Sequence, residues 1–223
     1  MADEHPAFLR NRRELANGLF TISLDPPEAV RATFHTPGQY HRLTIEGVGE
    51  SYFALASAPT ATTFEYLVRG GSTVADAMVD GLAVALSAVA GPGFPLQQAV
   101  GHHLIMVATG TGIAPIRSVI QTILPQRARF GRVQLVYGAR TEPELAFSSE
   151  FEAWASAGLE LHLTLSSKHP GWKGEVGRVQ QRLSPLEKTG AFAFLCGQAE
   201  METEVAGLLV SQGVEAARIF LNH

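Results

Sequence analysis

The chain has 223 residues, of which 46% are hydrophobic and 17% charged, and its formal net charge at pH 7 is −4. This length allows one large domain or two small ones, each with its own core. The weak negative charge gives no reason to expect nucleic acid or an anionic membrane as a partner. A single cysteine excludes an internal disulfide framework and any cysteine-based zinc or iron–sulfur site within the chain.

The sequence carries no targeting or membrane signal that we recognise. Its first residues are polar and acidic, unlike a secretory signal peptide. A long uncharged stretch, residues 81–109, is broken by glycine and proline and does not predict a membrane span. We therefore expect a cytoplasmic protein without a membrane span.

The first part of the chain has the pattern of an antiparallel β domain. Short segments alternate between apolar and polar residues and are separated by glycine and proline. Strands are expected at 19–24, 31–35, 40–45, 51–58, 63–69 and 82–89. Many short strands of this kind are typical of a small barrel. We predict an N-terminal antiparallel β-barrel over residues 1–100.

One short helical segment interrupts these strands. Gly71, Ser72 and Thr73 precede an expected helix at 74–78, with a hydroxyl residue at its cap. Backbone N–H groups at the start of a helix attract anions, so this turn is a candidate phosphate site. An ordinary capped helix that binds nothing is the alternative.

From residue 101 the pattern changes to alternating strands and helices. Strands are expected at 104–108, 133–137, 160–165, 192–195 and 218–221, and helices at 116–124, 148–156, 177–183 and 201–212. This alternation predicts a parallel sheet whose ligands bind at the carboxyl ends of its strands. We predict an α/β domain over residues 101–223.

The first strand of this second region leads into the clearest motif. A buried apolar strand is followed by small residues and the start of a helix: Thr109, Gly110, Thr111, Gly112, Ala114 and Pro115. Such a turn brings backbone N–H groups close to a phosphate, and proline suits the first helical turn. The third glycine of the dinucleotide fingerprint is absent, so a tight turn without a ligand remains an alternative.

The other strands also end in residues able to contact a ligand. Tyr137 and Arg140 follow the second strand, and Cys196 and Gly197 follow the fourth. Ser166, Ser167 and Lys168 follow the third. Singly, the cations could be solvated and the cysteine a small buried hydrophobe. Together they fit a dinucleotide lying across the sheet edge.

With its motifs in this order, the sequence resembles the ferredoxin–NADP reductase superfamily. The matching segments are Pro-Gly-Gln-Tyr at 37–40, Gly-Pro-Gly-Phe at 91–94, Gly-Thr-Gly-Ile-Ala-Pro at 110–115, Tyr-Gly-Ala-Arg at 137–140, and Cys196-Gly197 with Met201. The segment at 51–59 further resembles a subgroup of plant and bacterial members. The resemblance covers nearly the whole chain and implies a flavin-binding barrel followed by a nicotinamide-nucleotide domain.

This resemblance implies a flavin-dependent NAD(P)H oxidoreductase. Hydride would pass from NAD(P)H to FAD, and electrons would pass to an external acceptor, for which a second protein is one candidate. Gly71 to Thr73 would take the flavin pyrophosphate, which favours FAD over FMN. Cys196 would lie beside the nicotinamide, although a purely structural thiol is the alternative.

The expected flavin motif departs from the superfamily pattern R-x-Y-S-x-x-S. Alignment on Ser57 puts Ser51 at the arginine, Phe53 at the tyrosine and Ala54 at the first serine. The flavin contacts expected from this alignment are Tyr52, Phe53, Ala54, Leu55 and Ser57, with Phe53 stacking on the ring. Ser51 cannot replace a charge-assisted contact to phosphate, so weak FAD binding is expected.

Two other functions remain open at this stage. One is a nucleotide-binding module with a degraded flavin site and no redox turnover. The other is an electron-transfer subunit of a larger complex. The nucleotide itself is expected to be NADP rather than NAD, because Arg140, Ser166, Ser167 and Lys168 are cations and hydroxyls that suit a 2′-phosphate.

Overall fold

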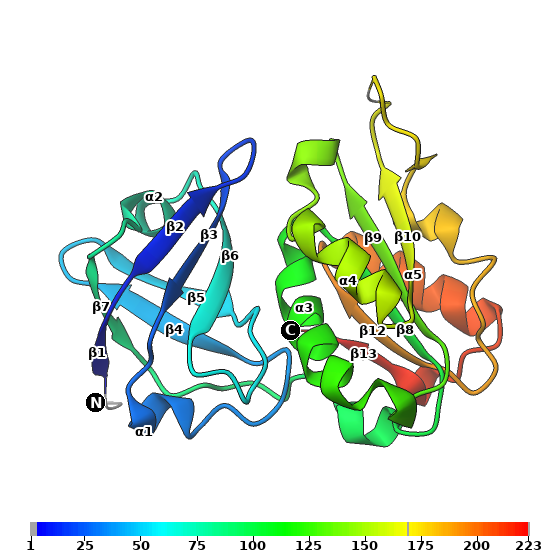
Figure 1. The fold of residues 1–223 in the computed structure, drawn as a ribbon, viewed down its shortest axis with the longest axis horizontal. Coiled ribbons are helices and arrows are strands. Elements are labelled where there is room, and N and C mark those ends of the chain that lie inside the picture. The colour runs from blue at the N-terminus through cyan, green and yellow to red at the C-terminus, as the bar shows by residue number, and fades with distance from the viewer. Residues whose placement is uncertain (1–3, 169, 223) are drawn as a thin grey trace.

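A computed structural model describes residues 4–168 and 170–222. Its N-terminal half consists of antiparallel strands, and its C-terminal half is a parallel sheet flanked by helices (Figure 1). These sheets confirm the predicted fold class. Within the described residues, no helix is long and apolar enough to cross a membrane.

Two antiparallel sheets form the N-terminal half. The first has four strands in the order β1 (His5–Phe8), β7 (Ala83–Leu86), β4 (Tyr40–Ile45) and β5 (Gly49–Ala54). The second has three, in the order β2 (Arg10–Glu14), β3 (Leu19–Leu24) and β6 (Phe64–Arg69). Strand β4 buries every second residue, as expected for a strand with one face in a core.

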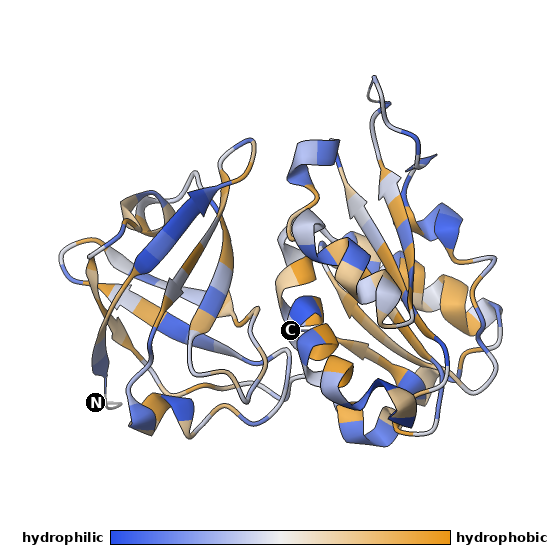
Figure 2. Ribbon diagram, viewed as in Figure 1, coloured by the Kyte–Doolittle hydropathy of each residue, from blue (hydrophilic) through white to orange (hydrophobic). Residues whose placement is uncertain are grey.

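The charged strand β2 differs from its neighbours. It carries mostly arginine and glutamate, is largely exposed, and stands out as hydrophilic in Figure 2. Neither β1 nor β2 was predicted as a separate strand, because neither shows a clear apolar alternation. Backbone pairing with β7 and β3, respectively, forms them instead.

The strand predicted at 31–35 is wrong. The segment contains the end of helix α1 (Glu28–Arg31), followed by further helical turns, in which the Phe34 N–H donates to the Arg31 carbonyl. Val30 and Phe34 lie four positions apart and are both buried. That spacing belongs to one face of a helical turn, and it outweighs the short alternation that suggested a strand.

Six parallel strands form the sheet of the C-terminal half. Their order is β11 (Glu175–Val176), β10 (Leu159–Leu165), β9 (Val133–Ala139), β8 (Leu104–Thr109), β12 (Phe192–Cys196) and β13 (Ile219–Leu221). The central strands are buried on both faces and are therefore almost wholly apolar. Their carboxyl ends meet at one edge of the sheet, where ligands bind in open α/β folds.

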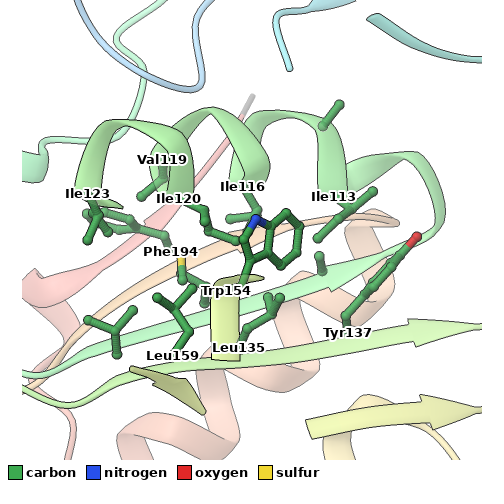
Figure 3. Close-up of a cluster of buried hydrophobic side chains, with 14 of the residues drawn as sticks. Ile113, Ile116, Val119, Ile120, Ile123, Leu135, Tyr137, Trp154, Leu159 and Phe194 are labelled. Atoms are coloured by element: carbon green, nitrogen blue, oxygen red, sulfur yellow. The ribbon is translucent and has the colours of Figure 1, made fainter. Parts of the chain in front are cut away.

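Helices cover both faces of this sheet. Helices α3 (Ile113–Ile123) and α4 (Phe151–Ser156) contribute to the core on one face, and α5 (Ala199–Ser211) contributes to the core on the other. Figure 3 shows the apolar side of α3 against the sheet, with these residues labelled: Ile113, Ile116, Ile120, Ile123, Leu135, Trp154, Leu159 and Phe194.

The helix predicted at 177–183 is wrong over its first part. Residues 175–176 form the edge strand β11, and only Val179–Arg182 make a 3₁₀ turn. The Gly177 N–H donates to the Leu165 carbonyl, and the Thr164 hydroxyl donates to the Gly177 carbonyl. This pairing with β10 holds the segment extended, which local helical spacing could not reveal.

One hydrophobic cluster joins the two halves. It includes Leu19, Ala56 and Phe94 from the N-terminal half together with the residues beneath α3. The rings of Phe94 and Phe194 stack with centroids 4.8 Å apart. The two halves therefore share a core. The domain boundary between residues 100 and 101 stays a prediction.

Candidate functional site

A cavity of about 1190 Å³ lies between the two halves. Residues of β4, β5 and β6 line one side, and the carboxyl ends of β8, β9, β10 and β12 line the other. The predicted residues that line it are Tyr52, Phe53, Ala54, Ser72, Gly110, Thr111, Gly112, Ala114, Pro115, Arg140, Ser166, Cys196 and Gly197. The fold thus gathers residues from distant parts of the sequence at one place.

The turn after β8 forms the centre of the sheet side of the cavity. Gly110 has a φ of +55°, and residues Gly110–Gly112 form a 3₁₀ turn that leads directly into α3. A Cβ atom on Gly112 would lie 2.2 Å from the Cys196 carbonyl oxygen. Only glycine fits there without displacing the neighbouring backbone, so this turn packs tightly against the end of β12.

The end of β12 carries Cys196 and Gly197. A Cβ on Gly197 would lie 2.2 Å from Thr109 Oγ1, and the Gly197 N–H donates to Glu202 Oε1 at 2.9 Å. Burial, with a further contribution from the charge of Glu202, raises the pKa of Cys196 to about 12. The side chain is therefore a neutral thiol at physiological pH, and a thiolate nucleophile is disfavoured.

Thr109 presents a polar atom without a partner. Its Oγ1 is buried and forms no hydrogen bond within the part of the chain that the structure describes. Thr109 also lines the cavity, between β8 and the Gly110–Gly112 turn. A buried hydroxyl of this kind normally has a partner, and this unpartnered atom lies beside the cavity.

Three arginines line the cavity: Arg69, Arg140 and Arg178. Among the described residues, Arg140 and Arg178 have no side-chain hydrogen bond or ion pair, and both are exposed. Arg69 Nη2 lies 3.6 Å from Glu144 Oε2, and Arg69 Nη1 lies 3.5 Å from the Asn17 carbonyl. The cavity thus offers three cations that are unpaired or only loosely held.

Sequence reasoning missed Arg69 and Arg178, and it included Lys168, which does not line the cavity. Arg69 ends a strand of the N-terminal half, and Arg178 follows the short edge strand β11. A cation that directly follows a strand was the signal that identified Arg140. The same signal at the end of 63–69 could have found Arg69.

The two aromatic residues of β5, Tyr52 and Phe53, both line the cavity but differ in how far they are exposed. Tyr52 is 64% exposed, and its ring lies edge-on to that of Tyr40, with centroids 5.8 Å apart. Phe53 instead packs against the buried core of the N-terminal half and meets the Tyr66 ring at 6.2 Å. Tyr52 therefore presents its ring on the outward face of the strand, while the half-buried Phe53 reaches the cavity from the core side.

Leu55 and Ser57 lie away from the cavity. Both are buried, and the Ser57 hydroxyl accepts a hydrogen bond from the Glu65 N–H. Neither is among the residues that line the cavity. Their place in the structure is that of core and support for β6, in contrast to the ligand contact expected from the sequence.

The turn at Gly71, Ser72 and Thr73 has the geometry of an ordinary helix cap. Ser72 Oγ accepts from the Ala75 N–H at 3.2 Å and caps helix α2 (Thr73–Ala77). The Gly71 N–H donates to Asp76 Oδ1 at 2.8 Å. Ser72 lines the cavity, but Gly71 and Thr73 do not. Two of the polar groups expected to meet a phosphate are thus already bonded within the turn.

Tyr137 supports the site from beneath and does not line the cavity. It is fully buried, and its hydroxyl donates to the Gly110 carbonyl at 3.3 Å while accepting from the Ala146 N–H at 3.1 Å. Burial raises the pKa of Tyr137, so the phenol keeps its proton and can donate. This side chain therefore holds the Gly110 turn in place.

A protein-family model and several known protein sequences match this chain. The family model of the oxidoreductase NAD-binding domain matches residues 106–207. Sulfhydrogenase 1 subunit gamma of Pyrococcus furiosus is 31% identical over 213 residues, which cover 91% of this chain and 73% of that protein. Fruit protein pKIWI502 of Actinidia deliciosa is 30% identical, with 92% of this chain and 72% of that protein covered.

Solved structures share the whole fold. The crystal structure of a ferredoxin NADP+ reductase from Neisseria gonorrhoeae with bound FAD and NADP superposes with a TM-score of 0.84 at 23% identity. The superposition covers 99% of this chain and 98% of that one. The same two-part architecture is therefore present in both.

Proposed function

Because the chain belongs to the ferredoxin–NADP reductase-like superfamily of oxidoreductases, we propose that it is a flavin-dependent NAD(P)H oxidoreductase, which passes hydride from NAD(P)H to FAD and electrons to an external acceptor. The observation that carries this proposal is the cavity between the two halves. It combines a candidate anion-binding turn with two arginines, Arg140 and Arg178, that have no acidic partner among the described residues. Its volume, about 1190 Å³, exceeds that of most single-ligand pockets.

The residues of the sheet side fit a nicotinamide nucleotide. The Gly110–Gly112 turn would hold its phosphates, since all three of its residues line the cavity. Arg140, Arg178 and Ser166 would meet a 2′-phosphate, which favours NADP over NAD. The unpartnered Thr109 hydroxyl and the neutral Cys196 thiol would border the nicotinamide.

The residues of the other side fit a flavin. Tyr52 and Tyr40 offer aromatic rings, and Ala54 offers only its backbone. Arg69 supplies the cation that Ser51 cannot, because it is the one arginine of the N-terminal half among the described residues that line the cavity. Ser72 adds a hydroxyl at the start of α2. We assign no general acid or base, since the side chains of this chain would bind, orient and exclude water.

A second function is supported by the relatives. Two of them are named as gamma subunits of Pyrococcus furiosus sulfhydrogenases, and the chain covers 73% and 76% of their lengths. An electron-transfer subunit of a larger complex is therefore the second candidate. A nucleotide-binding module without redox turnover remains the third, because the cap at Ser72 and the serine at position 51 offer little to a flavin phosphate.

The visible absorption spectrum of the purified protein tests these functions. A flavin band that appears with FAD and bleaches on addition of NADPH under anaerobic conditions supports the oxidoreductase. A protein that binds NADPH but shows no flavin band, even after incubation with FAD, supports the nucleotide-binding module. Isolation of the untagged chain from its own cells, together with a protein that absorbs as an iron–sulfur cluster, supports the subunit.

A further inference from the structure

Glu202 is a buried carboxylate next to the candidate site. Only 2% of it is exposed, and it lies in the first turns of helix α5. Its Oε1 accepts a hydrogen bond from the Gly197 N–H at 2.9 Å. A carboxylate is costly to bury unless it is hydrogen-bonded, and the bond to the Gly197 N–H provides part of that stabilisation.

The peptide that Glu202 holds is part of a tightly packed junction. A Cβ on Gly197 would meet Thr109 Oγ1 at 2.2 Å and Met201 Cε at 2.4 Å. On the other side, a Cβ on Gly112 would meet the Cys196 carbonyl oxygen at 2.2 Å. The ends of β8 and β12 therefore pack tightly against each other at Gly197. We expect a shift of the Gly197 peptide to displace the residues of both strand ends that line the cavity.

Glu202 also acts on the neighbouring thiol. Cys196 lines the cavity beside Gly197, and the Asn222 side chain reaches it from the end of β13. Burial raises the pKa of Cys196 most, the charge of Glu202 raises it further, and the hydrogen bond with Asn222 acts in the opposite direction. The Glu202 carboxylate thus accepts a hydrogen bond from Gly197 and also raises the pKa of Cys196, the residue before Gly197.

We propose that Glu202 is a positioning residue of this site: its hydrogen bond to the Gly197 N–H fixes the turn after β12, and its carboxylate acts on the Cys196 side chain that precedes this turn. The nucleotide part of this inference rests on the proposed function. The thiol part does not, because it concerns the ligand-free chain.

The single cysteine makes the charge effect directly measurable. The rate of alkylation by iodoacetamide, followed from pH 7 to pH 11, reports Cys196 alone. Glu202→Gln keeps an oxygen that can accept from Gly197 but removes the charge. At pH 9 we expect its alkylation to be clearly faster than wild type, by about threefold or more, because loss of the negative charge lowers the pKa of Cys196 and raises the thiolate fraction.

Glu204 provides the matched control. It lies on the same helix, and its carboxylate accepts from Gln180 at the surface. Glu204→Gln should leave the alkylation profile unchanged. Equal profiles for wild type and Glu202→Gln, or the same acceleration in Glu204→Gln, would overturn the charge effect.

Nucleotide binding tests the hydrogen bond. Calorimetry with NADP+ should show about tenfold weaker binding for Glu202→Leu, with the fold verified by circular dichroism. Glu202→Gln should stay within about threefold of wild type, since its amide oxygen replaces the acceptor. Wild-type affinity in a folded Glu202→Leu chain, or equal losses in both variants, would overturn the positioning role. A wild-type chain that binds no nucleotide would overturn the proposed function and this role together, while the alkylation profile would still decide the charge effect.

Discussion

Arg117 Nη1 lies 2.9 Å from Glu65 Oε2, and this ion pair joins helix α3 to strand β6. The same guanidinium donates to Glu150 Oε1 and to the Ala56 carbonyl. Only 6% of Arg117 is exposed. Helix α3, which begins at the candidate phosphate turn, is therefore connected to the N-terminal half by a buried charge as well as by apolar packing.

Replacing Arg117 by methionine should lower the free energy of unfolding by about 2 kcal/mol or more, because two carboxylates and a carbonyl lose their partner. Urea unfolding followed by circular dichroism measures the change. Arg132→Met is the matched control: its pair with Glu160 lies at the surface, where the arginine side chain is 50% exposed. That variant should lose less than about 1 kcal/mol. Similar losses in the two variants would contradict a special role for the buried pair.

Stability should fall as the pH is lowered from about 6.5 to about 4. Burial lowers the pKa of His41 from 6.5 to about 4 in the folded chain, where its Nε2 lies 2.8 Å from Tyr66 Oη. In this window the unfolded chain binds a proton that the folded chain does not, so the stability present above pH 6.5 is lost as the pH falls. The loss attributable to His41 is at most about 3 kcal/mol.

Unfolding measured at several pH values for wild type and His41→Gln checks this dependence. The variant should show a clearly shallower slope between pH 4 and 6.5. His162→Gln serves as comparison, since His162 is less buried and burial lowers its pKa in the same direction. If His41→Gln keeps the wild-type slope, another group causes the pH dependence.

Arg69→Gln should weaken FAD and FMN binding about tenfold, the loss expected when one charge-assisted contact to phosphate is removed. Riboflavin, which has no phosphate, should bind with unchanged affinity. Flavin fluorescence quenching measures all three ligands. Arg42→Gln is the control, because Arg42 lies on strand β4 of the other antiparallel sheet, pairs with Glu4 and Glu50, and does not line the cavity. Equal losses for riboflavin and FMN would mean that Arg69 acts on the fold and not on phosphate.

Arg178→Gln and Arg140→Gln should each weaken NADPH binding about tenfold or more while changing NADH binding little, because only NADPH carries the 2′-phosphate. Lys168→Gln should have a much smaller effect, since Lys168 does not line the cavity. Titration of each variant with both nucleotides gives the ratio of affinities. A large effect of Lys168 with none of Arg178 would favour the original sequence-based assignment.

Gly112→Ala should impair both folding stability and nucleotide binding, because its Cβ would lie 2.2 Å from a backbone oxygen of Cys196. Gly207→Ala is the control within α5, where a Cβ meets nothing within 4 Å. That change should stabilise the chain by roughly 0.5–1 kcal/mol. Thermal unfolding and NADPH titration of both variants separate the effect of the clash from the general effect of alanine.

Local motifs were predictable where neighbouring residues decide the structure. The apolar run before Gly110, and the proline at the start of the next helix, specify the strand–turn–helix unit without any distant contact. The parallel sheet followed from the alternation of such units. The candidate turn after β8 was therefore found from the sequence alone.

Features that depend on distant contacts were not predictable in the same way. Whether Tyr52 or Phe53 faces outward depends on the pairing of β5 with β4, and a shift of one residue reverses the two faces. Lys168 and Arg178 are both polar residues after a strand, but only the fold shows which of them reaches the cavity. The same holds for Arg117, whose partners lie 33 and 52 positions away.

The stacking of Phe94 on Phe194 limits which N-terminal and C-terminal halves of related proteins can be combined in one hybrid chain. Phe94 belongs to the segment that closes the N-terminal half, yet its ring completes the core beneath the parallel sheet. A hybrid that joins this sheet to a foreign barrel would need a ring of similar size and orientation at that point. Without one, the hybrid would contain a void beside β12, so grafting between relatives requires the two rings to be transferred as a pair.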